Sequence, residues 1–123
     1  MNIQRFEDII AWQKAQELVV ETYRLTNSSE NFRKDFGLRD QIRRAAVSAM
    51  SNIAEGFGRQ SDKEMANFLN IAGGSIAEVQ SQLYVARDLD YIEQFSFDSL
   101  YALADETSRL LTGFMKYLYK PTK

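Results

Sequence analysis

The side chains in this sequence that could carry out chemistry are carboxylates, lysines, tyrosines and hydroxyls, because its 123 residues include no histidine and no cysteine. The lack of histidine removes the commonest general base and the usual ligand of catalytic metals. The lack of cysteine removes thiolate nucleophiles, disulfides and cysteine-bound zinc. The remaining groups show no spacing that identifies a reaction. We therefore expect no enzymatic activity, no cofactor and no small-molecule substrate.

The charged residues are unevenly distributed along the chain. Residues 33–59 contain six basic and three acidic residues, whereas residues 88–106 contain six acidic residues and no basic one. One interpretation is a nucleic-acid-binding surface, because guanidinium groups match phosphate oxygens. A second interpretation is a head-to-tail ring in which the basic segment of one subunit contacts the acidic segment of the next. The arginines that would supply phosphate or interface contacts are Arg39, Arg43, Arg44 and Arg59.

The simplest alternative is a solvated helix face whose charges pair locally. Asp40 and Arg44 are four residues apart, and so are Glu55 and Arg59. Opposite charges at this spacing stabilise a helix modestly. These two pairs would then account for part of the charge pattern without any partner.

The elements that would position these residues are helices. The only proline is Pro121, and four segments have apolar residues at intervals of three and four. A chain of this length is sufficient for one core. Short linkers between long helices favour antiparallel neighbours. We therefore predict an all-α fold, an antiparallel up-down-up-down four-helix bundle forming a single domain over residues 1–123, with helices at about 7–26, 38–58, 62–89 and 98–119.

Small and hydrogen-bonding residues run beside the core positions of the second and third predicted helices. Solvent-exposed faces are usually richer in lysine and glutamate, so this composition indicates a contact between subunits or between helices. The residues predicted to make it are Asn52, Glu55, Ser75 and Glu78. Inward carboxylates at Glu55 and Glu78 are an alternative. The di-iron site typical of some bundles needs histidine, however, so we predict no metal.

Two consecutive glycines lie inside the third predicted helix. Gly73 and Gly74 each destabilise a helix by about 1 kcal/mol relative to alanine. Their presence predicts that another part of the structure packs closely against them.

The chain has no apolar run of the length that crosses a membrane, and its first residues lack the pattern of a signal peptide. We expect a cytoplasmic protein with no membrane partner.

Two segments, GLRDQIRRAAVSAMSNIAEGFGRQS and FLNIAGGSIAEVQSQL, resemble the four-helix-bundle family encoded in intervening sequences of bacterial 23S ribosomal RNA genes. Trp12 and Tyr23 in the first predicted helix also fit, so the resemblance covers nearly the whole chain. Its specific residues are Leu38, Gln41, Ile42, Arg44, Ala45, Ser48, Asn52, Ile53, Glu55, Gly56, Arg59, Gly74, Ser75 and Glu78.

The resemblance implies an antiparallel four-helix bundle that assembles as a homopentameric ring with no attached enzymatic activity. It also implies kinship with the accessory protein of diversity-generating retroelements, a basic pentamer that binds nucleic acid and a reverse transcriptase. This chain departs from those relatives in its acidic balance, with a pI of about 5.2, which weakens attraction to a polyanion. It also lacks the family's proline before the NIAEG segment, where Met50 and Ser51 stand, and another in the first loop.

These observations lead to two hypotheses of different kinds. The first is a non-enzymatic homopentameric scaffold or adaptor that contacts RNA, DNA or a nucleic-acid enzyme. The second is a protein–protein interaction module that binds no nucleic acid.

Overall fold

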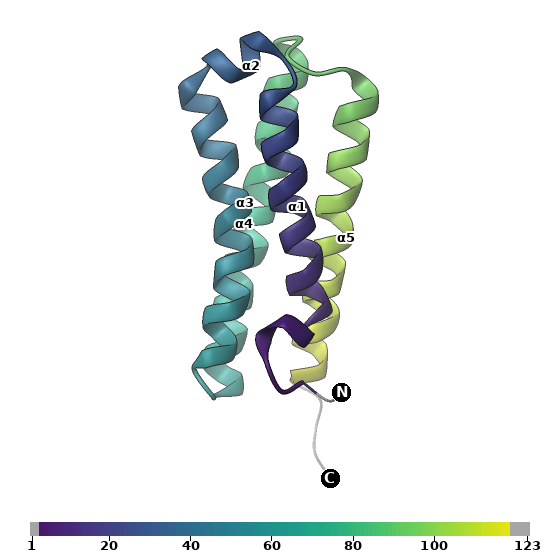
Figure 1. The fold of residues 1–123 in the computed structure, drawn as a ribbon. Helices are drawn as coiled ribbons and strands as arrows, with labels where there is room; N and C mark the ends of the chain where they lie inside the picture. The colour runs from purple at the N-terminus through teal and green to yellow at the C-terminus, as the bar shows by residue number, and fades with distance from the viewer. Residues whose placement is uncertain (1–2, 119–123) are drawn as a thin grey trace.

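The computed structural model describes residues 3–118, and no residue in that range lies in a strand. A short 3₁₀ turn, η1 (Phe6–Asp8), precedes five helices. These are α1 (Ile10–Asn27), α2 (Glu30–Lys34), α3 (Phe36–Gly58), α4 (Asp62–Asp88) and α5 (Gln94–Leu118). Four of the helices are long and form a bundle (Figure 1). The predicted all-helical fold class is confirmed.

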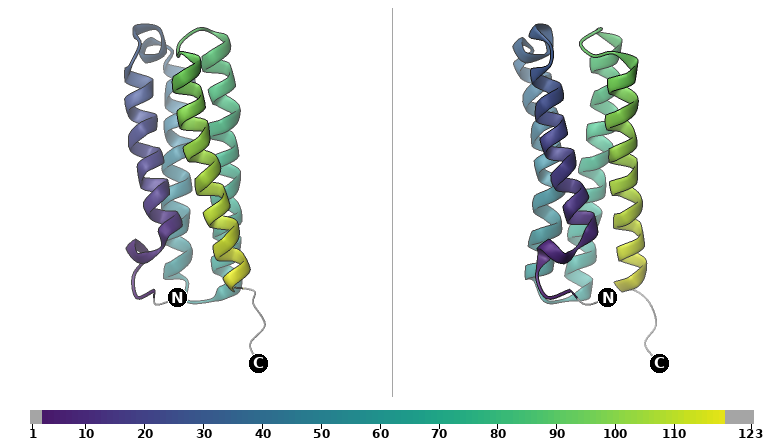
Figure 2. Two further views of the ribbon diagram at one scale, coloured as in Figure 1. Left: turned by 90° about the vertical axis from the view of Figure 1, so that its right-hand side faces the viewer. Right: turned by 45° about the vertical axis from the view of Figure 1, so that its right-hand side comes forward.

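Each long helix packs mainly against two others. α1 contacts α3 and α5, and α4 contacts α3 and α5, with the α3–α4 contact being the most extensive. The helices stand side by side along their whole length in all three ribbon views (Figures 1 and 2). In Figure 1, α2 and the α4–α5 connection lie at one end of the bundle, and the α3–α4 connection lies at the other.

The first long helix begins three residues later than predicted. Residues 6–8 form the 3₁₀ turn, and the backbone of Ile9 is extended, with φ −76° and ψ 117°. The side chain of Asp8 stabilises this turn by accepting hydrogen bonds from the backbone N–H groups of Gln4 and Arg5. The apolar spacing alone did not reveal this change of backbone direction.

The predicted linker before residue 38 contains a helix that the sequence analysis missed. Ser29 begins α2 by accepting a hydrogen bond from the backbone N–H of Phe32 at 3.1 Å. The side chain of Phe32 is fully buried at the end of the bundle. Asp35 then caps α3 by accepting from the N–H of Leu38 at 3.1 Å, so α3 begins at Phe36.

The last helix starts four residues before the predicted position. The N–H of Phe97 donates to the carbonyl of Glu93 at 3.0 Å. The helical hydrogen bonds of α5 therefore begin before residue 98, the predicted start. Position 119, the predicted end of this helix, lies outside the described residues.

The core is built largely from the predicted apolar positions, and α3 and α4 each bury three alanines. The tightest approach is at Gly56, where an added Cβ would stand 2.8 Å from the Cβ of Phe68 and 2.9 Å from the Sδ of Met65. Gly73 and Gly74 differ, because nothing lies within 4 Å of an added Cβ at either position. The predicted close packing against these two glycines is therefore wrong within the described chain.

No helix in residues 3–118 combines the length and the hydropathy needed to cross a lipid bilayer.

Candidate interaction surface on helices α3 and α4

Arg39 is held at the start of α3 by nearby groups of the same chain. Its Nε donates to Oδ1 of Asp40 at 2.9 Å, and its Nη1 donates to the carbonyl of Arg33 at 3.1 Å. The guanidinium group lies over the ring of Phe36, 4.7 Å from its centroid. These contacts fix the side chain along the helix surface.

Arg43 connects α3 to the end of α1. Its Nε donates to Oγ1 of the buried Thr26 at 2.8 Å, and its Nη2 donates to Oδ1 of Asn27 at 3.0 Å. The guanidinium group stacks on Tyr23 with a distance of 4.5 Å to the ring centroid. All of these partners are neutral, so the positive charge of Arg43 is oriented but not compensated.

Arg59 lies at the opposite end of α3. It forms the predicted ion pair with Glu55, at 3.2 Å, and its guanidinium group lies 5.0 Å from the ring centroid of Phe68. Fifteen residues separate it from Arg44, which corresponds to about 22 Å along the helix at ~1.5 Å per residue. The four predicted arginines therefore do not form one continuous surface.

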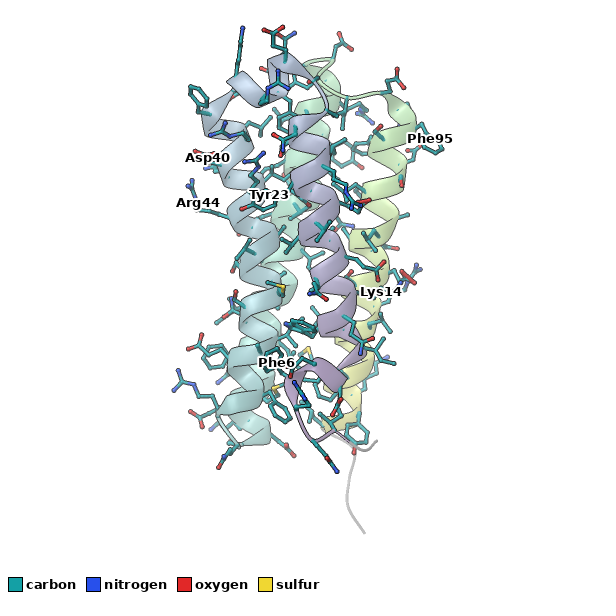
Figure 3. All side chains as sticks on the ribbon, in the orientation of Figure 1. Phe6, Lys14, Tyr23, Asp40, Arg44 and Phe95 are labelled. Atoms are coloured by element: carbon teal, nitrogen blue, oxygen red, sulfur yellow. The ribbon has the colours of Figure 1, made fainter. Side chains whose placement is uncertain are left out.

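Arg44 differs from the other three. It is exposed, and it makes neither an ion pair nor a hydrogen bond with any residue in the range 3–118. The predicted Asp40–Arg44 pair is absent because the carboxylate of Asp40 pairs with Arg39 instead. Tyr23, Asp40 and Arg44 border a shallow depression between α1 and α3 (Figure 3).

A pair of serine hydroxyls joins the middle of α3 to the middle of α4, and an asparagine of α3 supports it. The hydroxyls of Ser48 and Ser75 are hydrogen bonded at 2.9 Å. The side-chain amide of Asn52 donates to the carbonyl of Ser48 at 2.8 Å and to its hydroxyl at 3.0 Å. Ser75 therefore contacts α3 directly, whereas both hydrogen bonds of Asn52 stay within α3.

A pair of glutamines continues this polar contact about two turns away, and neither residue was predicted as a site residue. The amide of Gln82 donates to Oε1 of Gln41 at 3.4 Å. The Oε1 of Gln82 is buried and accepts no hydrogen bond from the part of the chain that the structure describes. The signal that could have found the pair is their position beside the core seam of each helix.

The two predicted carboxylates both point away from the core. Glu55 and Glu78 are exposed, and Glu78 has no ion-pair partner within residues 3–118. In the same range, no three His, Cys, Asp or Glu residues are grouped so that they could hold a metal ion.

The basic and acidic segments meet at one end of the bundle. The hydroxyl of Tyr91, in the α4–α5 connection, donates to Oδ2 of Asp35 at the start of α3, at 3.0 Å. This hydrogen bond to the carboxylate raises the pKa of Tyr91. The residues of α2 and the first half of α3 therefore lie at the same height as those around the start of α5 (Figure 1).

The sequence profile of the family described as 23S rRNA-intervening sequence protein matches residues 7–113. The chain belongs to this family. A crystal structure of a protein of unknown function from the S23 ribosomal protein family of Bacteroides thetaiotaomicron is similar, with a TM-score of 0.77 and 28% sequence identity. The match covers 86% of this chain and 98% of that one. No curated protein matches the chain.

Proposed function

We propose that this 23S rRNA-intervening sequence protein is a non-enzymatic scaffold that assembles as a homopentameric ring of antiparallel up-down-up-down bundles. The observation that carries the proposal is the composition of the outward side of α3 and α4, here called the outer face. It combines small side chains, an exposed isoleucine and two charges without partners in the described chain. Its residues are Arg44, Ser48, Ser51, Ile71, Gly74 and Glu78.

The outer face has the features of a protein contact rather than of a solvated helix surface. Ile71 has 52% of its surface exposed in the single subunit. Small neutral residues surround it, whereas ordinary solvated helices carry many lysines and glutamates. Burial of this face between subunits would remove the apolar surface from water and provide opposite charges for the two unpaired ones.

The distribution of charge supports a ring. The basic residues of α2 and of the first half of α3 lie at the same end of the bundle as the acidic residues of the α4–α5 connection (Figure 1). A rotation about an axis parallel to the bundle preserves height, so these regions could face one another between successive subunits. Heterologous contacts close into a ring when the rotation that relates successive subunits divides a full turn.

The alternation of the helix connections supports the antiparallel topology. α2 and the α4–α5 connection lie at one end, and the short α3–α4 connection lies at the other. Connections this short join neighbouring helices that run in opposite directions.

A non-enzymatic role is supported by the chemistry available. The sequence contains neither histidine nor cysteine. The exposed carboxylates of the candidate surface are either paired with arginine, as in Glu55, or isolated, as in Glu78. Neither arrangement provides a base and a nucleophile held together.

A phosphate contact with RNA or DNA is the second candidate function. It is favoured by the adjacent Arg43 and Arg44, because no carboxylate within residues 3–118 forms an ion pair with either charge. The depression bordered by Tyr23 offers a concave surface beside them. The acidic balance of the whole chain, with a pI of about 5.2, favours the scaffold without nucleic acid.

Sedimentation equilibrium of the purified full-length protein tests the scaffold proposal. A homopentamer has a mass of about 71 kDa, five times the 14.2 kDa subunit. A single species of that mass over a range of micromolar concentrations is expected. A species of one or two subunits at these concentrations would contradict the ring.

A further inference from the structure

Two opposite charges stand at the same height on the outer face. The Ser48–Ser75 and Gln41–Gln82 hydrogen bonds fix the register of α3 against α4. Arg44 lies between the two bonded positions of α3. Glu78 lies between the two bonded positions of α4. The guanidinium and the carboxylate therefore occupy the same level of the bundle on adjacent helices.

Arg44 is exceptional among the arginines. All nine arginines of the chain lie within the described residues, and each of the other eight makes a hydrogen bond or an ion pair there. Even strongly exposed ones are paired: Arg24 bonds Glu21 at 2.9 Å, and Arg109 bonds Asp105 at 3.4 Å. The side chain of Arg44 is left free to meet a group outside the subunit.

Glu78 is equally exceptional among the carboxylates. Other acidic residues without a partner in the range 3–118 lie in the first turn of α4 or in the α4–α5 connection. Carboxylates in a first turn interact favourably with the helix dipole. Glu78 lies in the middle of α4, beyond the reach of that effect.

The residues next to Arg44 and Glu78 do not cover these two side chains. Ser48 and Ser51 lie one and two turns from Arg44 on α3, and Gly74 lies one turn from Glu78 on α4. An added Cβ at Gly74 would meet nothing within 4 Å in its own subunit. The long side chains beside the two charges, Gln41 and Gln82, are hydrogen bonded to each other. The other neighbours are small, which favours the approach of a helix from another copy.

We propose that Arg44 of one subunit forms an ion pair with Glu78 of the neighbouring copy, and that this pair recurs at every interface of the ring. This inference rests on the proposed assembly and names its contact. The occupant of the outer face is a second copy, because this chain supplies both charges at one height. A rotation about an axis that is parallel to the bundle and lies in front of the outer face preserves this height and brings α3 of one copy toward α4 of the next.

Charge reversal tests the pair. Arg44→Glu places two carboxylates at each interface, and Glu78→Arg places two guanidinium groups there. Each single variant should raise the dissociation constant of the assembly by about 30-fold or more, the effect of breaking a desolvated charge pair. The double variant Arg44→Glu/Glu78→Arg restores opposite charges and should recover most of the assembly.

The matched control is Arg24→Glu, which makes the same charge change on α1, where the side chain of Arg24 is 73% exposed. It should leave the mass unchanged, and far-UV circular dichroism should show every variant to be helical. Dissociation by the single variants without rescue in the double variant would overturn the pair. Full assembly of both single variants would also overturn it while leaving the scaffold intact. A wild-type protein that is monomeric in the same measurement would instead refute the assembly itself.

Discussion

Replacing Gly56 with alanine tests how closely α3 approaches α4. The added Cβ would stand 2.8 Å from the Cβ of Phe68, whereas ordinary contacts begin near 3.4 Å. The Cβ of Phe68 is bonded directly to the backbone of α4, so rotation of the side chain cannot move it away. The Sδ of Met65, at 2.9 Å, belongs to a flexible side chain that can move more easily. One end of α4 would therefore have to shift by about 0.6 Å.

The expected change in stability combines two opposing effects. Overpacking a well-packed contact costs about 1–3 kcal/mol. Alanine within a helix is favoured over glycine by about 1 kcal/mol. Because the closest atom of Phe68 cannot rotate away, we expect the first effect to dominate. Gly56→Ala should lower the free energy of unfolding by about 1 kcal/mol, measured by urea denaturation at a fixed protein concentration with an unchanged m-value.

Gly73→Ala is the matched control, because an added Cβ there meets nothing within 4 Å. It should raise the free energy of unfolding by about 1 kcal/mol through helix propensity alone. A Gly56→Ala protein that is as stable as wild type, or is stabilised like the control, would refute the close approach of the two helices.

Three further predictions concern the core, the end of the bundle and the arginines. Ile76→Ala should reduce the free energy of unfolding by about 2–5 kcal/mol, because the side chain is fully buried. Ile71→Ala, at a half-exposed position of the same helix, should change the stability of the single chain by less than about 0.5 kcal/mol. Equal effects of the two substitutions in urea denaturation would contradict the orientation of α4. The pKa of Tyr91 is raised in the folded protein above its usual value of 10.0, so its hydrogen bond stabilises the fold below about pH 10 and is lost as the pH rises through the raised pKa. The stability difference between wild type and Tyr91→Phe should therefore shrink in alkaline solution, and thermal melts showing a constant difference across that range would argue against the bond. If RNA or DNA is bound through Arg43 and Arg44, the double alanine variant should flatten the dependence of log affinity on log salt by about 2, and an identical slope would remove both residues from the contact.

Much of the helical architecture can be predicted from the sequence because long amphipathic helices leave a periodic pattern. The buried positions of α4 include Met65, Leu69, Ala72, Ile76 and Val79, which follow intervals of four and three without interruption. The short elements are harder to recognise. α2 has only five residues, and its one buried side chain, Phe32, forms no periodic pattern. Ser29 and Asp35 cap α2 and α3, but the sequence pattern was interpreted as a loop through Gly37.

The pairing of the charged residues could not be predicted in the same way. The sequence spacing predicts Glu55–Arg59 correctly, but it also predicts Asp40–Arg44, which does not form. The aromatic partners of Arg43 and Arg59 come from other helices and are brought together only by the tertiary fold. Local spacing therefore identified the basic segment, whereas the three-dimensional arrangement distinguishes Arg44 from its neighbours.

The measurement that tests the central claim most directly is an experimental structure of the native particle, by crystallography or electron cryomicroscopy. The proposed assembly predicts a closed ring of five subunits in which the outer face of α3 and α4 is buried against a neighbouring copy. The guanidinium of Arg44 would lie within ion-pair distance of a carboxylate from that copy. A particle in which this face is open to solvent, or in which the subunits meet only through α1 and α5, would contradict the account.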